Sequence, residues 1–529
     1  MSRGGVVRAA CLVVMHLAAT IAAADQPSSR AATGISGIHP HLAMDNDEGE
    51  CGTGAVVPWA DRLWVITYGP HLPKGSSDKL YEVSPDLSRT VRPESIGGTP
   101  ANRMIHDESR QLFIGPYAID EHGAVRTIPH DSMPGRLTGV ARHLTDPAGR
   151  IYVATMEEGL YEVDVRSLAV TTLIRDGNLP PPKAAGHDPL GDVVSRLPGY
   201  HGKGCYSGQG RVVYATNGDR AASAQAVLGD PTTPSGALAE WRRPGEDWSL
   251  VRRNQFTEVT GPGGIHGNRS AHSDPLWSIG WDARSLILMV LDGGTWHAFR
   301  LPKVSHAYDG AHGWNTEWPR IREVGDGDLL MTMHGAFWRF PREFSASHAV
   351  GIRPRSAYLK VVGDFCRWGD DLVFGCDDAA KKEFLNERRI KGEVAGPQRS
   401  NSNLWFTNPS VPDRLGPPHA TGAVWLHDHV AAGAEAEPLL VAGWDHGSAW
   451  FINGGDDECR FSGDLGGITV PAHGSVRLPI PRDLEWLRVT AVTACRDTSV
   501  VVTLAAHDGR GSEPESIFAG LAATDDDRP

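Results

Sequence analysis

Apolar and polar residues alternate over short stretches along most of the chain, which predicts β-strands and not helices. The stretches are rich in β-branched and aromatic residues and are separated by charged or glycine-containing turns. A pair of such stretches, each preceded by a turn, recurs at residues 61–87, 110–128, 149–174, 210–241, 284–302, 327–340, 370–406 and 438–452. Helical periodicity is nearly absent between them.

These repeated hairpins are typical of a β-propeller built from four-stranded blades. We therefore predict an all-β chain with a seven-bladed β-propeller, in which the eighth hairpin closes or caps the ring. An eight-bladed ring is the alternative. Two stacked β-sandwiches fit less well because they lack a hairpin that repeats so consistently. Most tryptophans of the blades, such as Trp64 and Trp241, are expected in the core.

The same pattern divides the chain into segments. Residues 1–24 read as a signal peptide, with a charged start, an apolar run and small residues before the cleavage point. Residues 25–45 are a predicted linker, 46–455 the propeller, 456–509 a small β extension and 510–529 a disordered tail. We expect a secreted or periplasmic protein without membrane insertion, because no later stretch has the ~20 consecutive apolar residues of a membrane span.

Composition and charge narrow the possible partners. The 61 glycines, 37 prolines and 16 tryptophans suit many short strands joined by tight turns. The net charge of −13 and the lack of a basic block argue against nucleic acid. An anionic sugar is still compatible, because one or two placed arginines can hold it. No organic cofactor is indicated, and we expect a monomer.

Six cysteines follow the predicted cleavage site: Cys51, Cys205, Cys366, Cys376, Cys459 and Cys495. In an oxidising compartment they can pair. Proximity in the sequence favours Cys366 with Cys376 and Cys459 with Cys495. No Cys-x-x-Cys spacing exists, so a thiolate zinc site is not expected.

Histidine, arginine and aromatic residues gather in loops that are predicted to share one face of the propeller. Ligands usually meet the face made by loops entering the inner strands and by turns between the second and third strands. We place there His71, Tyr117, His201, Lys203, His266, Arg269, His272, His306, His312, Trp318 and His334. The candidate inner strands NRMIH, VARHL and EWPRIRE should direct Arg103, His106, Arg142, His143, Arg320 or Arg322 toward the central channel. Many of the 23 histidines should nevertheless be structural.

Six blocks in the same order resemble a known enzyme family: ECGTGAVVPWADRLWVITYGPH, RPESIGGTPANRMIH, LFIGPYAID, HLTDPAGRIYV, TEWPRIREV and GDFCRWGDDLVFG. They are similar to segments of the propellers described as glycoside hydrolase family 145 and as polysaccharide lyase family 42, the L-rhamnose-α-1,4-D-glucuronate lyases. The resemblance covers about residues 46–455. It implies a seven-bladed propeller, often with bound calcium, that releases rhamnose from rhamnose-capped, glucuronate-containing glycans of the arabinogalactan type.

Reaction chemistry favours elimination over hydrolysis. The C5 proton of a 4-substituted glucuronate becomes removable once an arginine or a calcium ion neutralises the adjacent carboxylate. Because this proton and the C4 oxygen lie on the same face, one histidine or tyrosine can act as both base and acid. Hydrolysis by an α-L-rhamnosidase is the alternative and would use two facing carboxylates, which do not stand out in the matched blocks. A non-catalytic glycan-binding propeller is the other alternative.

The resemblance also suggests roles for single residues. His106 and Tyr117 are the candidates for proton transfer, although some relatives have histidine at the position of Tyr117. His71 lies where the hydrolase description places its key histidine. Arg142 and Arg320 are expected to hold the carboxylate. The remaining candidates for substrate binding are Arg103, His143, His201, His272, Trp318 and His334, and the metal ligands stay unassigned.

Overall fold

A computed structural model describes residues 42–48, 52–69, 72–99, 103–182, 188, 190–219, 230, 232–305, 319–325, 327–358, 361–379, 400–416 and 418–506. The predicted signal peptide, most of the predicted linker and the predicted tail lie outside these ranges. Within them the chain consists of β-strands and short 3-10 turns, so the all-β prediction is confirmed. In this part of the chain, no helix has the length and apolar character needed to cross a membrane.

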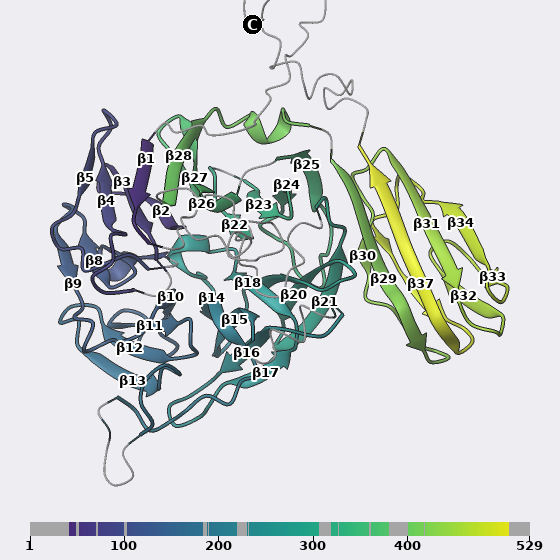
Figure 1. Ribbon diagram of the computed structural model, residues 1–529, viewed down its shortest axis with the longest axis horizontal. Helices are drawn as coiled ribbons and strands as arrows, with labels where there is room; N and C mark the ends of the chain where they lie inside the picture. Colours follow the sequence, from purple (N-terminus) through teal and green to yellow (C-terminus); the bar gives the residue numbers. More distant parts are fainter. Residues whose placement is uncertain are drawn as a thin grey trace, which may run out of the picture.

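Groups of four antiparallel strands, most of them consecutive in the sequence, follow one another around a ring (Figure 1). The first sheets are β2 (Thr53–Trp59), β3 (Arg62–Thr67), β4 (Leu80–Val83) and β5 (Arg89–Val91); β6 (Arg103–His106), β7 (Gln111–Ile114), β8 (Tyr117–Asp120) and β9 (Val125–Thr127); β10 (Leu137–Arg142), β11 (Arg150–Thr155), β12 (Leu160–Asp164) and β13 (Val170–Ile174); and β14 (Tyr200–Gly208), β15 (Arg211–Gly218), β16 (Ala237–Trp241) and β17 (Ser249–Arg252). This arrangement is that of a β-propeller.

The ring continues with β18 (Gln255–Thr260), β19 (Leu276–Trp281), β20 (Leu286–Asp292) and β21 (Thr295–Leu301), followed by β22 (Arg320–Arg322), β23 (Leu329–Met333), β24 (Ala336–Phe340) and β25 (Arg353–Ala357). The next sheet contains β26 (Val361–Trp368), β27 (Asp371–Ala379) and β28 (Ser400–Thr407). Its fourth strand is β1 (Leu42–Asn46), which pairs antiparallel with β28. The N-terminal end of the described chain therefore completes the last sheet, so residues 42–45 are part of a sheet and not of the expected linker.

The hydrophobic core of the propeller lies between neighbouring sheets. One cluster joins Trp64 of β3 to Tyr117 of β8, and another joins Tyr152 of β11 to Trp241 of β16. Trp64 and Trp241 are almost fully buried, as predicted. Because successive side chains of a strand point to opposite faces, each sheet can pack against both of its neighbours.

A second β unit follows the propeller. Strands β29 (His419–Val430), β37 (Cys495–Ala505), β31 (His446–Asn453) and β34 (Ser475–Pro479) form one sheet, and β33 (Ile468–Val470), β32 (Cys459–Gly463) and β36 (Val489–Ala491) form another. The two sheets share one apolar core, which contains Trp425, Phe451 and Phe461. β30 (Leu439–Leu440) and β35 (Trp486–Leu487) instead extend the propeller sheet beyond β21.

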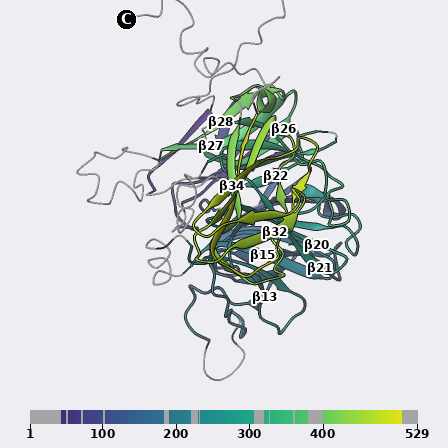
Figure 2. The ribbon, with the colours of Figure 1, turned by 90° about the vertical axis from the view of Figure 1, so that its right-hand side faces the viewer.

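This unit corrects two predictions. Residues 438–452 were expected to form a hairpin that closes or caps the ring, but their two strands do not pair with each other, because β30 joins the edge of a propeller sheet while β31 pairs with β37. The boundary expected after residue 455 moves to His419, because β29 and β31 pair with the same strand. Seen from the side, β32 and β34 lie over the edge of the ring (Figure 2).

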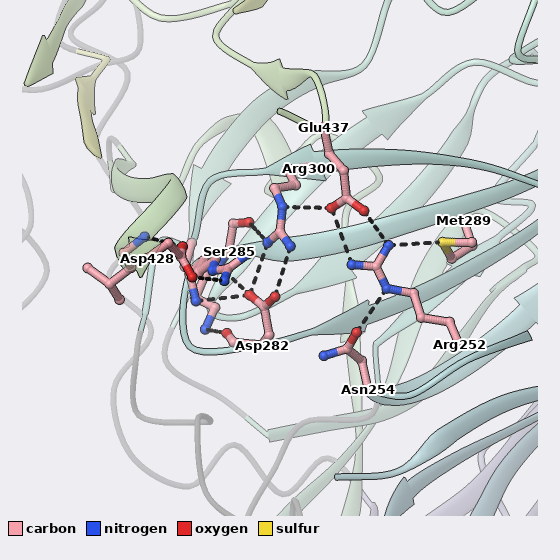
Figure 3. Close-up of polar contacts among 11 residues, drawn as sticks. Arg252, Asn254, Asp282, Ser285, Met289, Arg300, Asp428 and Glu437 are labelled. Carbon is pink, nitrogen blue, oxygen red and sulfur yellow. Dashed lines mark hydrogen bonds and ion pairs between the residues drawn. The ribbon is translucent and has the colours of Figure 1, made fainter. Parts of the chain in front are cut away.

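Ion pairs fasten this unit to the propeller (Figure 3). Glu437 accepts hydrogen bonds from Arg252 at 2.5 and 3.2 Å and pairs with Arg300 at 2.8 Å. Arg300 in turn pairs with Asp282 at 2.9 Å. The neighbouring arginines hold the pKa of Glu437 below its usual value, although burial alone would raise it. One carboxylate therefore links strands from two propeller sheets to the C-terminal unit.

The described cysteines are buried thiols that differ in their surroundings. Cys366 and Cys376 belong to different core clusters, and Cys376 lies opposite Val362 in the hairpin, so their expected pairing is wrong.

Cys459 and Cys495 are side by side. The backbone of Arg460 exchanges hydrogen bonds with residues 492 and 493, and burial together with the hydrogen bond to the Cys495 thiol raises the pKa of Cys459 to about 12.

We expect Cys459 and Cys495 to form a disulfide when the protein is exported. The two thiols would lose their hydrogens to an oxidised dithiol oxidase, and the bond would add about 2–4 kcal/mol to the free energy of unfolding. Peptide mass mapping without reductant should find the linked peptides, whereas Cys205 and Cys366 should be alkylated after unfolding. Full alkylation of Cys459 and Cys495 in exported protein would contradict this expectation.

Candidate functional site

A cavity of about 770 Å³ opens on one face of the propeller. Its lining residues lie on the turns that connect the first and second strands of several propeller sheets, and on the turn that follows β24. The lining residues are Asp107, Glu108, Arg142, Pro262, Gly263, His266, Gly267, Asn268, Arg269, Asp274, Glu323, Gly325, Gly327 and Arg342. This face is opposite to the one on which a site was expected.

The long loop between β18 and β19, residues 261–275, forms much of the wall. Gly264 and Gly267 adopt left-handed backbone angles, with φ of 52° and 77°. A Cβ atom on Gly267 would lie 2.3 Å from Cδ of Arg142, so glycine is needed for the close approach. Asn268 holds the loop in shape, because its side chain accepts from the Gly263 N–H at 3.1 Å and donates to the Pro275 carbonyl at 3.1 Å.

His266 projects from this loop toward Asp107, and Nδ1 of the histidine lies 2.9 Å from Oδ1 of the aspartate. A carboxylate only accepts hydrogen bonds, so it favours the proton on Nδ1 and leaves the Nε2 lone pair available. The His266 side chain is 49% exposed, and Nε2 has no hydrogen-bond partner among the described residues. The pair can therefore accept and return a proton at Nε2.

Three arginines line the same cavity, Arg142, Arg269 and Arg342, and they differ in their partners. Arg142 forms an ion pair with Glu108 and donates to the His266 carbonyl at 3.3 Å. Burial would raise the pKa of Glu108, but its hydrogen bond with Arg142 brings the pKa below the usual value. Arg342 donates to backbone carbonyls. Arg269 is exposed and makes no hydrogen bond or ion pair with the described part of the chain, so its guanidinium is available to an anion.

Two further carboxylates line the cavity. Asp274 accepts from the Ser270 N–H at 2.9 Å. Glu323 accepts from the Ile265 N–H at 3.1 Å through Oε1, while its buried Oε2 has no hydrogen-bond partner in the described structure. With Asp107 and Glu108, four carboxylates and three guanidinium groups meet in one cavity. The site can bind a carboxylate through Arg269 and can also accept hydroxyl groups.

The predicted proton-transfer residues are not in this cavity. His106 is fully buried and contacts Ser109 Oγ and the Pro147 carbonyl, each at 2.8 Å, and burial lowers its pKa. Tyr117 is also buried, and its hydroxyl donates to the Gly97 carbonyl at 2.9 Å. His106 ends β6 and Tyr117 begins β8, so they lie at opposite ends of one sheet. The structure does not bring them together.

The predicted histidines are scattered. His143 is buried, contacts Glu162 at 2.8 Å and stacks on Tyr152. His334 is buried with its ring edge-on to Trp281.

His201 is partly buried and its ring lies edge-on to Tyr200, while His272 is exposed on the loop of residues 261–275 without lining the cavity. His71 and Trp318 lie outside the described residues.

The predicted arginines of the inner strands meet in a buried ion network inside the ring. Arg322 donates to Glu258 at 2.6 Å and to Asp364 at 2.9 Å. Arg320 pairs with Glu258 at 3.1 Å, and Arg103 pairs with Asp364 at 3.3 Å. The five side chains are at most 7% exposed. Although burial raises the pKa of Asp364, the surrounding arginines bring it below its usual value.

Sequence reasoning found part of the cavity. His266 and Arg269 were singled out but assigned to the opposite face, because their loop was expected to enter an inner strand or to join second and third strands, whereas it joins β18 and β19, the first and second strands of their sheet. Asp107 was not singled out. The glycines around His266 were the available signal, since they mark a backbone that must approach other groups closely.

Calcium, which the family resemblance implies, stays a prediction. No group of three or more histidine, cysteine, aspartate or glutamate side chains close enough to hold a metal ion was found in the described ranges.

Comparison with known proteins does not identify a family. No protein-family model matches the chain, and no curated protein matches it. The chain is similar to a solved structure titled "Structure of U3-55K", with 10% identity over 69% of this chain and 99% of that chain and a TM-score of 0.38. It is also similar to YCF48 from Cyanidioschyzon merolae, with 10% identity over 68% and 98% of the two chains and a TM-score of 0.35. We draw neither fold nor function from these weak likenesses.

Replacing Asp364 with asparagine should strongly destabilise the protein. The buried charges of Arg103 and Arg322 would both lose the Asp364 carboxylate, although Arg322 keeps Glu258, and we expect a cost of about 3–5 kcal/mol of unfolding free energy. Asp413→Asn is the matched control, because it breaks the ion pair with Arg355 at a site where Asp413 is 58% exposed, and we expect a cost below about 1 kcal/mol. Urea denaturation measures both, and equal effects would contradict the role given to the network.

Proposed function

We propose that this protein is an exported carbohydrate-active enzyme that cleaves terminal L-rhamnose-α-1,4-D-glucuronate linkages by β-elimination. The observation that carries the proposal is the cavity in which the Asp107–His266 pair lies with the unpaired guanidinium of Arg269. These groups supply the two things that elimination from a uronate needs, a base and a neutralised carboxylate. The family resemblance of residues 46–455 supports the choice of linkage.

In the proposed reaction, Arg269 binds the carboxylate of glucuronate and stabilises the negative charge that develops on it. Nε2 of His266 removes the C5 proton while Asp107 stabilises the imidazolium that forms. The electron pair of the C5–H bond becomes the C4–C5 double bond, and the C4–O4 bond breaks. The proton then passes from His266 to the departing oxygen, which leaves as the anomeric hydroxyl of rhamnose.

The remaining parts of the proposal concern the whole chain. We infer a closed ring of seven blades. Six successive groups of four consecutive strands, from β2–β5 to β22–β25, each form a sheet, the fifth of which is extended by β30 and β35, and β26–β28 with β1 form the seventh. Export follows from the signal peptide predicted for residues 1–24. The acting form is a monomer on rhamnose-capped, glucuronate-containing glycan, with calcium as the metal suggested by the resemblance.

Hydrolysis of the same linkage is the second candidate, because the cavity gathers Asp107, Glu108, Asp274 and Glu323. Two of these carboxylates on either side of the sugar could act as acid and as base or nucleophile. A non-catalytic glycan-binding propeller is favoured by one observation, the engagement of Arg320 with Glu258 deep in the ring, which removes it from any role in holding substrate.

Incubation with gum arabic distinguishes these functions. Elimination should release rhamnose and, in equal amount, a product with the ultraviolet absorbance of a conjugated enoate. Rhamnose without this absorbance would indicate the hydrolase. The absence of both products would refute an enzyme acting on this linkage and favour the binding protein.

Substitutions in the cavity test the assigned roles. His266→Ala should lower kcat by about 10²–10⁴-fold, because the base is lost. Arg269→Ala should lower kcat/KM by about 10²-fold or more, because the carboxylate charge is no longer neutralised. His272→Ala is the matched control in the same loop and should leave the rate unchanged. Wild-type rates for both cavity variants would exclude this cavity as the active site.

A further inference from the structure

A second cavity, of about 750 Å³, opens on the same face of the propeller as the first. It lies between the sheet that begins with β2 and the sheet that begins with β26, and it is built from the turns that follow these inner strands and from the turn after β4. Its lining residues are Pro58, Trp59, Ala60, Asp61, Arg62, Pro85, Leu87, Trp368, Gly369, Asp370 and Asp371. None of them belongs to the proposed active site.

Two tryptophans at the ends of inner strands form the aromatic part of this cavity. Trp59 ends β2 and Trp368 ends β26, and both are partly buried. The indole N–H of Trp59 donates to the carbonyls of Ile119 and Asp120 at 3.0 and 2.9 Å, and the Trp368 ring packs near Phe406. Both rings are therefore held in place before a ligand arrives, which lowers the entropic cost of binding.

The polar part of the cavity consists of hydrogen-bond acceptors. Asp61, Asp370 and Asp371 are exposed, and their carboxylates make no hydrogen bond or ion pair with the described residues. The guanidinium of Arg62 is already engaged, because it pairs with Glu82 and donates to the Ala60 carbonyl. The cavity thus offers free acceptors and no free cation, so it would repel a uronate and favour groups that donate hydrogen bonds.

We propose that this cavity, which we call the rim cavity, binds neutral, hydroxyl-rich sugar units of a glycan. Aromatic faces suit the C–H faces of a sugar ring, and carboxylates accept hydrogen bonds from pairs of sugar hydroxyls. The inference rests on the proposed function in one respect: the neutral units belong to the same glycan whose acidic end enters the first cavity. The first cavity then binds the acidic unit of the glycan through Arg269, and the rim cavity binds neutral units through Asp370 and Asp371.

Binding can be measured without catalysis by titrating the full protein with neutral arabinogalactan oligosaccharides from which rhamnose and glucuronate have been removed. We expect saturable heat of binding. Asp370→Asn combined with Asp371→Asn should weaken affinity by about tenfold or more, because two exposed acceptors lose their charge without touching the core. Trp368→Ala should have at least the same effect, provided that its circular dichroism and melting temperature match wild type.

Controls separate this inference from the proposed function. Trp450→Ala removes a tryptophan that is 36% exposed on the C-terminal unit and should leave binding unchanged, as should Arg269→Ala in the first cavity. Binding that persists in a protein without lyase or hydrolase activity supports the rim cavity and refutes the proposed function. The inference is overturned if the neutral oligosaccharides do not bind, or if the Asp370 and Asp371 double variant binds them as tightly as wild type. It is also overturned if a lysine-rich peptide binds more tightly and displaces the sugar.

Discussion

The buried ion network inside the ring is the constraint on which the rest of the propeller depends. Glu258 and Asp364 share three arginines, which come from the inner strands β6 and β22, while the two carboxylates come from β18 and β26. A charge taken out of water is costly unless it is paired, so these strands can occupy their places only together. Asp364 also accepts from the Val56 N–H at 2.9 Å, which brings β2 into the same network.

The position of the candidate site follows from this arrangement. Inner strands held at a common centre present their following turns at one end of the ring. There Asp107 contacts His266, which is far from it in the sequence, and Arg269 lines the same cavity. The same end carries the rim cavity, since β2 and β26 finish there with tryptophans. In such folds the strands form a rigid scaffold, and the functional residues usually lie on the turns.

The C-terminal unit is joined to the propeller as a fixed neighbour. Its strands β30 and β35 continue a propeller sheet, its apolar core is continuous with that of β19–β24, and Glu437 and Glu485 pair with propeller arginines. Such a junction combines backbone pairing, apolar burial and ion pairs. These contacts are all made with the sheets of β14–β17, β18–β21 and β22–β25.

The sequence by itself determined the strands, because an alternation with period two is a local property, and it indicated the repeat and the inner strands that contain Arg103, Arg142 and Arg320. It also singled out His266 and Arg269 as chemical groups. Only the tertiary structure decided that His106 and Tyr117 lie at opposite ends of one sheet, where they form hydrogen bonds with backbone and neighbouring groups. It also decided that residues 419–455 are not part of the ring, and that the cavity opens on the face opposite to the one predicted. These outcomes depend on which strands pair and on which two strands each loop connects. Strand pairing over long distances in the sequence is determined by packing and by buried charges across the whole ring, so a local pattern does not reveal it.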